Sequence, residues 1–188
     1  MEDFQKLLTK IGGILNKLKI HYYVTGGYAI SVWGRPRSTF DIDVIIKLPE
    51  SQIGILTKKL RGISEINYIE KEDMENAVAK KGEFNFIHGN SGIKVDFWIW
   101  KENDDFEISA MKRRVAKKIL DEKIYFISAE DLILSKLIWH KKTETSRHLE
   151  DAESIIKISG KKLDKKYLTK WAKKLGISKI LNKIIKND

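Results

Sequence analysis

Residues 24–46 read VTGGYAISVWGRPRSTFDIDVII, and this stretch decides the fold. The segment His21–Thr25 is aromatic and β-branched and runs into the pair Gly26–Gly27, which predicts a strand that ends in a tight turn. A helix over Tyr28–Trp33 is expected next, followed by a second strand over Asp41–Leu48. Strand, helix and strand in succession predict an α/β (α+β) fold.

The flanking segments extend this pattern in both directions. Apolar residues at three- and four-residue steps predict amphipathic helices over residues 3–18 and Ser51–Leu60. Two further strands are expected at Phe84–His88 and Ile93–Trp100, because the turn-prone sequence GNSG at Gly89–Gly92 joins them. The expected core is therefore a mixed sheet flanked by helices.

The remainder of the chain is predicted to be mostly helical. Residues 117–120 and 123–127 favour one more hairpin, and Ser128–Asp131 has the spacing of a helix N-cap followed by an acid. Three or four helices are expected from there to the end. We therefore predict a catalytic-type core over residues 1–127 and a helical C-terminal extension over residues 128–188.

The composition excludes several classes of site and location. The chain has 188 residues, 42% hydrophobic and 33% charged, as expected for a compact soluble protein. It has no Cys, which excludes disulfides, thiolate nucleophiles and zinc–thiolate centres. No window of about 18 residues is both apolar and uncharged, and the N-terminal sequence MEDFQKLLTK lacks the features of a signal peptide. A cytoplasmic protein without a membrane partner is expected.

Three acids interrupt apolar strands. Because side chains alternate along a strand, Asp41 and Asp43 share one face with Cα atoms about 6.6 Å apart. Asp96 interrupts the apolar segment Ile93–Trp100 in the same way. A single such acid is usually a solvated or capping residue, but like charges about 4 Å apart repel by roughly 4 kcal/mol at an effective dielectric of 20. Three acids together therefore predict a bound cation, and oxygen ligands suit Mg²⁺ held together with substrate phosphates.

The glycine pair predicts a phosphate-binding turn. Without Cβ atoms, Gly26 and Gly27 let the backbone approach a ligand closely, and the following helix N-terminus offers free N–H groups. A plain tight turn is the simpler interpretation of a glycine pair by itself. The continuation G-G-x13-D-x-D favours the phosphate site, because Arg37 and Thr39 stand just ahead of the acids.

These motifs resemble the signature of the nucleotidyltransferase superfamily, which includes DNA polymerase β, antibiotic nucleotidyltransferases and minimal nucleotidyltransferases. The segment IKVDFWIW at residues 93–100 resembles the third-carboxylate strand of that superfamily. The Gly-Gly form with R-x-T-x-D-x-D, a helix bearing Lys136, and R-x-x-x-D at Arg147 and Asp151 is most similar to the abortive-infection type nucleotidyltransferase toxins. The resemblance covers roughly residues 20–155. One departure is Gly27, where many members carry Ser.

The resemblance implies a polymerase-β-like core and a Mg²⁺-dependent transfer of a nucleoside monophosphate from an NTP such as ATP. It implies that Asp41 and Asp43 bind two Mg²⁺ ions and the nucleotide, and that Asp96 binds one ion and accepts a proton from the acceptor hydroxyl. A role in a toxin–antitoxin pair is also implied. The residues expected to bind the nucleotide are Gly26, Gly27, Arg37, Thr39 and Lys136, with Arg37 and Lys136 neutralising the triphosphate.

Simpler interpretations of the helical residues stay open at this point. Asp151 follows Arg147 by four residues, so the two are also suited to an ordinary i,i+4 ion pair. Lys136 is equally compatible with the solvated face of an amphipathic helix. His140 and His148 lack a clear metal-ligand spacing and are placed outside the site.

The C-terminal segment concentrates the positive charge. Residues 157–188 hold eleven Lys and two Asp, which accounts for +9 of the formal net charge of +10. A solvated helix face is the ordinary interpretation, but such a segment also attracts polyanions. The acceptor is therefore expected to be RNA (tRNA-like), a partner protein or a small hydroxylated molecule. The alternative function is a non-catalytic module that binds nucleic acid or a partner protein through this basic tail.

Overall fold

The computed structural model describes residues 2–186, and their contacts divide the chain into two compact units. The first unit contains the described residues up to Tyr28 together with Thr39–Phe126. The second contains Ala29–Ser38 together with the described residues from Ile127 onward. The chain therefore passes from one unit to the other three times. The predicted boundary near residue 127 stays a prediction.

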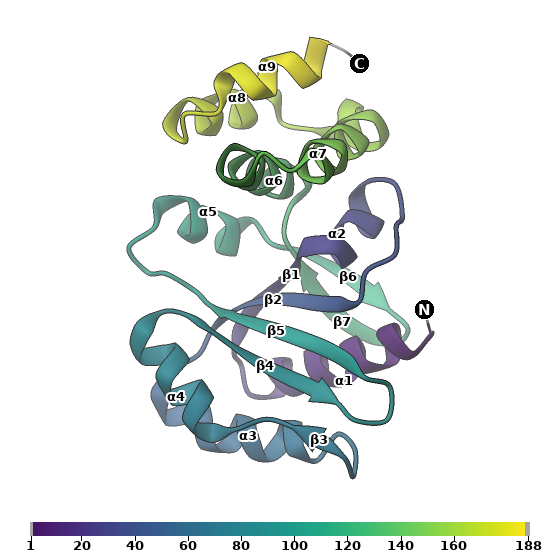
Figure 1. The fold of residues 1–188 in the computed structure, drawn as a ribbon, viewed down its shortest axis with the longest axis vertical. Helices are drawn as coiled ribbons and strands as arrows, with labels where there is room; N and C mark the ends of the chain where they lie inside the picture. Colours follow the sequence, from purple (N-terminus) through teal and green to yellow (C-terminus); the bar gives the residue numbers. More distant parts are fainter. Residues whose placement is uncertain (1, 187–188) are drawn as a thin grey trace. The chain divides into compact units, whose positions relative to one another are not determined.

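The first unit is built on one mixed seven-stranded sheet of order β3-β4-β5-β2-β1-β7-β6 (Figure 1). The central strand β2 pairs in parallel with β5 and antiparallel with β1. This confirms the predicted fold class, a mixed sheet flanked by helices. The strands are β1 (His21–Thr25), β2 (Asp41–Lys47), β3 (Asn67–Tyr68), β4 (Glu83–His88), β5 (Ile93–Ile99), β6 (Val115–Ile119) and β7 (Glu122–Phe126).

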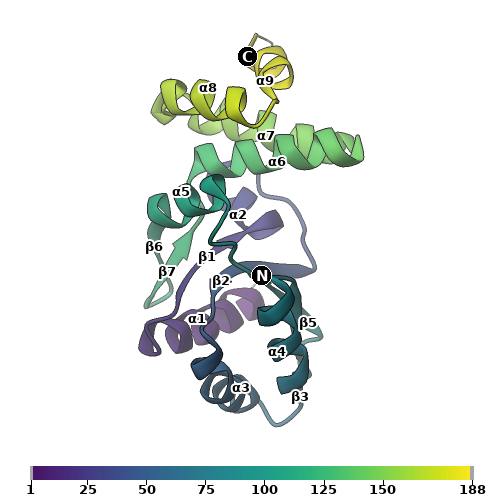
Figure 2. The ribbon, with the colours of Figure 1, turned by 90° about the vertical axis from the view of Figure 1, so that its left-hand side faces the viewer.

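Helices α1, α3 and α4 lie together on one side of this sheet (Figures 1 and 2). The predicted apolar stripe of α1 is confirmed, since Leu7, Leu8, Ile11 and Leu15 are fully buried. Along β2, buried Ile42 alternates with the half-buried acids, so the acids lie on the face opposite the apolar residues. The helices of this unit are α1 (Glu2–Lys17), the 3₁₀ turn η1 (Glu50–Gln52), α3 (Ile53–Arg61), α4 (Lys71–Lys80) and α5 (Asp105–Arg113).

Helix α2 (Gly26–Trp33) begins earlier than predicted. The sequence predicts a turn at the glycine pair and a helix from Tyr28, but the helix starts at Gly26, directly after β1. Gly26 has a φ of +64°, a left-handed conformation that glycine adopts without strain. This one residue therefore turns the strand into the helix without a separate loop.

The second unit is helical, and its described residues from Ile127 onward form four α-helices, in agreement with the predicted three or four. Leu132, Leu134 and Leu137 of α6 are fully buried, because neighbouring helices cover more than one side of it. No helix in residues 2–186 is long and apolar enough to cross a membrane. The elements are α6 (Ala129–Thr143), α7 (Ser146–Ser159), the 3₁₀ turn η2 (Gly160–Lys162), α8 (Lys165–Lys174) and α9 (Ser178–Lys186).

The predicted N-cap of α6 is confirmed and extends into a buried polar group. Ser128 Oγ accepts the backbone N–H of Asp131 at 3.1 Å and donates to Asp131 Oδ2 at 2.6 Å. The hydroxyl of Tyr167 donates to Asp131 Oδ1 at 2.6 Å, which links α6 to α8. These bonds satisfy a carboxylate that has no exposed surface.

We predict that Ser128→Ala lowers the free energy of unfolding by about 1 to 2 kcal/mol, because it removes both the cap and one partner of a buried carboxylate. Urea denaturation measures the change. Thr145→Ala is the matched control, since Thr145 is the N-cap of α7 but its side chain makes no capping bond. An equal loss in both variants would contradict the role given to the Ser128 hydroxyl.

Candidate active site

A row of polar residues crosses four neighbouring strands of the first unit. Strand register places Asp43 of β2 beside Thr25 of β1 and beside Asp96 of β5. Asp96 in turn lies beside Asn85 of β4. Residues paired in register point to the same face of a sheet. The two predicted catalytic carboxylates Asp43 and Asp96 are therefore neighbours on one face.

Asp43 lies directly against the glycine turn. A Cβ atom at Gly26 would overlap the carboxylate of Asp43, and the φ of +64° at this position already disfavours other residues. Gly26 is therefore required by the close approach of this carboxylate as well as by the backbone conformation. Gly27 is buried in the first turn of α2, where N–H groups lack partners within the helix.

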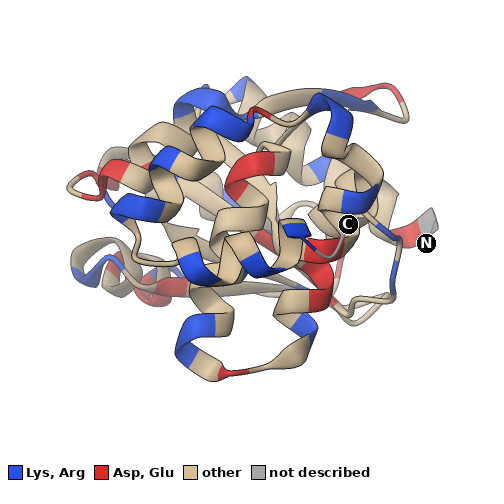
Figure 3. Ribbon diagram, turned by 90° about the horizontal axis from the view of Figure 1, so that it is seen from above, with Lys and Arg blue, Asp and Glu red and all other residues tan. Residues whose placement is uncertain are grey.

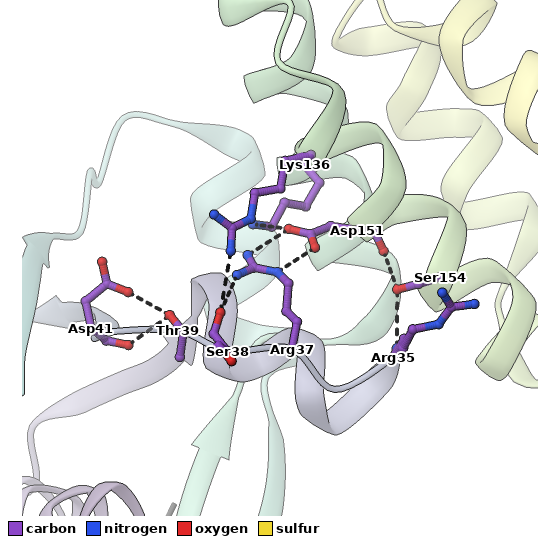
Figure 4. A network of polar contacts seen from close by, with 9 residues as sticks. Arg35, Arg37, Ser38, Thr39, Asp41, Lys136, Asp151 and Ser154 are labelled. Carbon is purple, nitrogen blue, oxygen red and sulfur yellow. Dashed lines mark hydrogen bonds and ion pairs between the residues drawn. The ribbon is translucent and has the colours of Figure 1, made fainter.

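Asp41 is held by Thr39. The Thr39 hydroxyl donates to Asp41 Oδ1 at 2.8 Å, as Figure 4 shows. The predicted nucleotide-binding role of Thr39 stays a prediction, and its observed contact orients an acid of the site. Asp41 lies in register with Lys94 of β5, two residue pairs before Asp43 and Asp96 and on the same face of the sheet.

Asp96 is the most buried of the three acids, with 7% of its surface exposed. Its Oδ2 forms an ion pair of 2.9 Å with the ammonium of Lys94. Its Oδ1 is buried and has no hydrogen-bond partner among the described residues. The hydrogen bond to Asp96 raises the pKa of Lys94, burial opposes this, and the charges of Asp96 and Asp41 add to it. The site therefore already binds one cationic group.

The donor set fits a hard cation. The carboxylates offer only oxygen atoms, and one buried oxygen of Asp96 lacks a partner, which is the chemistry that Mg²⁺ prefers. Within residues 2–186, no group of three or more His, Asp or Glu residues is arranged to hold a metal ion. The assignment of all three acids as metal ligands thus stays a prediction.

In the second unit, Arg37 and Lys136 converge on Asp151 (Figure 4). Arg37 binds the carboxylate through two hydrogen bonds, from Nε at 2.8 Å and from the terminal NH2 at 3.0 Å. Lys136 Nζ lies 2.9 Å from Asp151 Oδ2. Lys136 and Asp151 are only 7% and 4% exposed. The interpretation of Lys136 as a residue of a solvated helix face is therefore wrong.

The alternative i,i+4 pair of Arg147 with Asp151 is also wrong. Arg147 instead donates to the backbone carbonyl of Ser38 at 3.4 Å, and Arg37 donates to the same carbonyl at 3.1 Å. Two arginines thus fix the backbone just after the GRPR segment. The phosphate-neutralising roles implied for Arg37 and Lys136 stay predictions, while their observed partner is Asp151.

Sequence reasoning missed Lys94 and Asn85. Lys94 precedes Asp96 by two residues in a predicted strand, so strand alternation alone places both on the same face. That signal was available in the sequence. The position of Asn85 depends on the pairing of β4 with β5 and on its register, which the hairpin turn sets only once its type is known.

No protein-family model and no curated protein matches the sequence. Solved structures match its fold. A nucleotidyltransferase-like antigenic protein from Paracoccidioides brasiliensis aligns with a TM-score of 0.57 at 14% identity, over 82% of this chain and 76% of that one. The chain has a nucleotidyltransferase-like fold.

Two antibiotic-related proteins share this nucleotidyltransferase-like fold. The antibiotic-resistance factor ANT(2'')-Ia has a TM-score of 0.53 at 15% identity, over 83% of this chain and 84% of its own. The lincosamide antibiotic adenylyltransferase LnuA has a TM-score of 0.51 at 18% identity, over 78% and 92%. None of these three proteins is described as an abortive-infection toxin, so that finer similarity stays a prediction.

We predict that Gly26→Ala lowers the free energy of unfolding by clearly more than Gly92→Ala. Both glycines have positive φ, +64° and +66°, so both substitutions cost about 1 kcal/mol of backbone strain. Only at Gly26 does the new methyl group meet a carboxylate, whereas a Cβ at Gly92 meets nothing within 4 Å. Denaturant unfolding of both variants measures the difference, and equal losses would refute the close approach of Asp43.

We predict that Asp151→Asn lowers the free energy of unfolding at pH 7 by about 3 kcal/mol, because it leaves buried Lys136 without its counter-charge. The exposed neighbour Glu150 provides the control Glu150→Gln, which should change stability by less than about 0.5 kcal/mol. Urea denaturation measures both.

The same variant should change how the free energy of unfolding depends on pH in acid solution. Burial alone would raise the pKa of Asp151, but hydrogen bonds from Arg37 and Lys136 outweigh it and hold the pKa below the ordinary 3.8. The stabilisation is therefore complete above the unfolded pKa and is lost as pH falls through the lower folded pKa. Wild type should lose stability more steeply than Asp151→Asn below about pH 4. If the free energies of unfolding of wild type and Asp151→Asn fell equally with pH below about 4, the pairing of Asp151 with Arg37 and Lys136 would be contradicted.

Proposed function

We propose that the protein is a nucleotidyltransferase that moves a nucleoside monophosphate from an NTP to a hydroxyl-bearing acceptor and releases pyrophosphate. The observation that carries the proposal is the pairing of Asp43 with Asp96 across β2 and β5, with one buried Asp96 oxygen lacking a partner. A purely structural sheet gains nothing from two adjacent carboxylates. The nucleotidyltransferase-like fold supports the same conclusion.

The roles of the three acids follow from their surroundings. Asp41, Asp43 and Asp96 would hold Mg²⁺, with two ions expected, and bound Mg²⁺ would neutralise charge on the transferred phosphate and on the leaving pyrophosphate. Asp96 also accepts the proton of the acceptor hydroxyl. The acceptor oxygen then bonds to the α-phosphorus as the bond from phosphorus to the pyrophosphate oxygen breaks.

Two further residues prepare this reaction. Thr39 fixes one oxygen of Asp41, so the rotamer of that acid is set before substrate binds. Gly26 leaves the space that the Asp43 carboxylate occupies, and the first turn of α2 offers backbone N–H groups to phosphate oxygens. The chain thus contributes mainly position and charge, as phosphoryl transfer requires.

Two observations bear on the acceptor. LnuA is described as a lincosamide antibiotic adenylyltransferase and ANT(2'')-Ia as an antibiotic-resistance factor, which supports a small hydroxylated acceptor. Helices α8 and α9 instead favour RNA, because they carry eight exposed Lys residues and no acid between Lys165 and Lys186 (Figure 3). The same lysine surface supports the second candidate function, a non-catalytic module that binds RNA.

We predict that Asp43→Asn abolishes transfer of label from α-labelled NTP in the presence of Mg²⁺, with RNA, cell extract or hydroxylated antibiotics as acceptors. The loss should exceed a hundredfold, because one metal ligand is removed from the reaction centre. Asp121→Asn is the matched control, since it removes the same charge from a fully exposed side chain in a hairpin turn. It should retain wild-type transfer.

Each outcome separates the two candidate functions. Transfer by wild type and by Asp121→Asn alone supports the enzyme and identifies the acceptor class. Transfer that persists in Asp43→Asn refutes the proposed site. No transfer by any variant, together with RNA retention that weakens steeply with added salt, favours the non-catalytic module.

A further inference from the structure

The ion pair of Lys94 with Asp96 places a cation of the protein's own inside the carboxylate site. Lys94 Nζ lies 2.9 Å from Asp96 Oδ2. The Asp96 side chain is 9% exposed, whereas that of Lys94 is 46% exposed. The carboxylate is therefore fixed in the protein, while the lysine reaches it from the solvent side on a flexible stem.

The sheet explains why a cation lies here. Lys94 is in register with Asp41 on β2, and two residues further along β5 Asp96 is in register with Asp43. Lys94 thus lies beside a group of carboxylates that repel one another. A resident ammonium lowers that repulsion in the absence of metal.

We propose that Lys94 is a displaceable counter-ion: it neutralises the carboxylate site in the metal-free protein, and a divalent cation must drive its ammonium away from Asp96 in order to bind. This inference rests on the proposed function, since the cation would be the catalytic metal. Metal binding is then an exchange of one cation for another rather than occupation of an open site.

The charges and contacts favour the exchange. Within residues 2–186, Asp96 offers a divalent ion one oxygen without a hydrogen-bond partner, Oδ1, and a second oxygen, Oδ2, that pairs with Lys94. An ammonium and a divalent ion that share one carboxylate repel each other, so the more strongly attracted divalent ion displaces the lysine. Because the Lys94 side chain is nearly half exposed, its ammonium regains water when it leaves.

The first test is the Mn²⁺ affinity of Lys94→Met without nucleotide, measured by titration calorimetry. Without its competitor, the site should bind Mn²⁺ about tenfold more tightly than in wild type. Lys71→Met is the matched control, since Lys71 forms an exposed i,i+4 pair with Glu75 on α4. It should leave the affinity unchanged, and Asp96→Asn should abolish the binding.

A second readout is the melting temperature in the presence of a chelator. Lys94→Met should melt about 3 °C below wild type, because the acids lose their counter-ion. Added Mn²⁺ should raise its melting temperature by more than it raises that of wild type. If Lys94→Met does not fold, Lys94→Gln removes the same charge and keeps a hydrogen-bonding group, and the same results are expected.

The outcomes distinguish the inference from the proposed function. Mn²⁺ binding that is lost in Asp96→Asn but unchanged or weaker in Lys94→Met overturns the counter-ion role and leaves the metal site intact. Absence of Mn²⁺ binding in wild type and in Lys94→Met overturns both. Tighter binding in Lys94→Met together with a lower metal-free melting temperature supports the exchange.

Discussion

The parallel pairing of β2 with β5 is the constraint on which the site depends. Six residue pairs in register fix Asp43 beside Asp96, while buried residues such as Ile42 and Val95 pair on the opposite face. A slip of one residue would turn the acids into the apolar layer and the isoleucines out of it. The hydrophobic pattern that stabilises the sheet therefore also sets the position of the carboxylates. Burial of one face supplies the free energy that holds two like charges together on the other.

Three different devices make that arrangement tolerable. Gly26 removes a side chain where the Asp43 carboxylate needs space, so it acts through sterics. Thr39 donates a hydrogen bond to Asp41, so it acts through orientation. Lys94 supplies a positive charge to Asp96, so it acts through electrostatics. Among the described residues, one buried oxygen of Asp96 still has no hydrogen-bond partner, and such an oxygen favours the binding of a cation.

The sequence predicts the strands of the central sheet and the positions of its acids, because β-branched residues and period-two alternation are strong local signals. It does not predict β3, α4 or α5. β3 is only two residues long, and α4 buries only Met74, Ala77 and Val78, so neither has a strong periodicity. The burial of Lys136 was also beyond local reasoning, since its partner Asp151 lies on another helix and also binds Arg37, which comes from a distant part of the chain. The cap at Ser128 was predictable because all of its contacts with α6 lie within four residues.

The chain treats two buried ion-paired acids in opposite ways, and the contrast supports the proposed site at Asp96. Asp151 accepts two hydrogen bonds from Arg37 and pairs with Lys136, so both of its oxygens are used by fixed basic groups. Three contacts with fixed basic groups leave this carboxylate little capacity for a further ligand. Asp96 pairs one oxygen with the exposed Lys94, and its other oxygen has no hydrogen-bond partner in the described part of the chain. Leaving a buried carboxylate oxygen unsatisfied costs folding free energy, about 1 to 3 kcal/mol for a polar group and more for a charge. That cost supports the proposal that Asp96, rather than Asp151, binds a cation and takes part in the reaction.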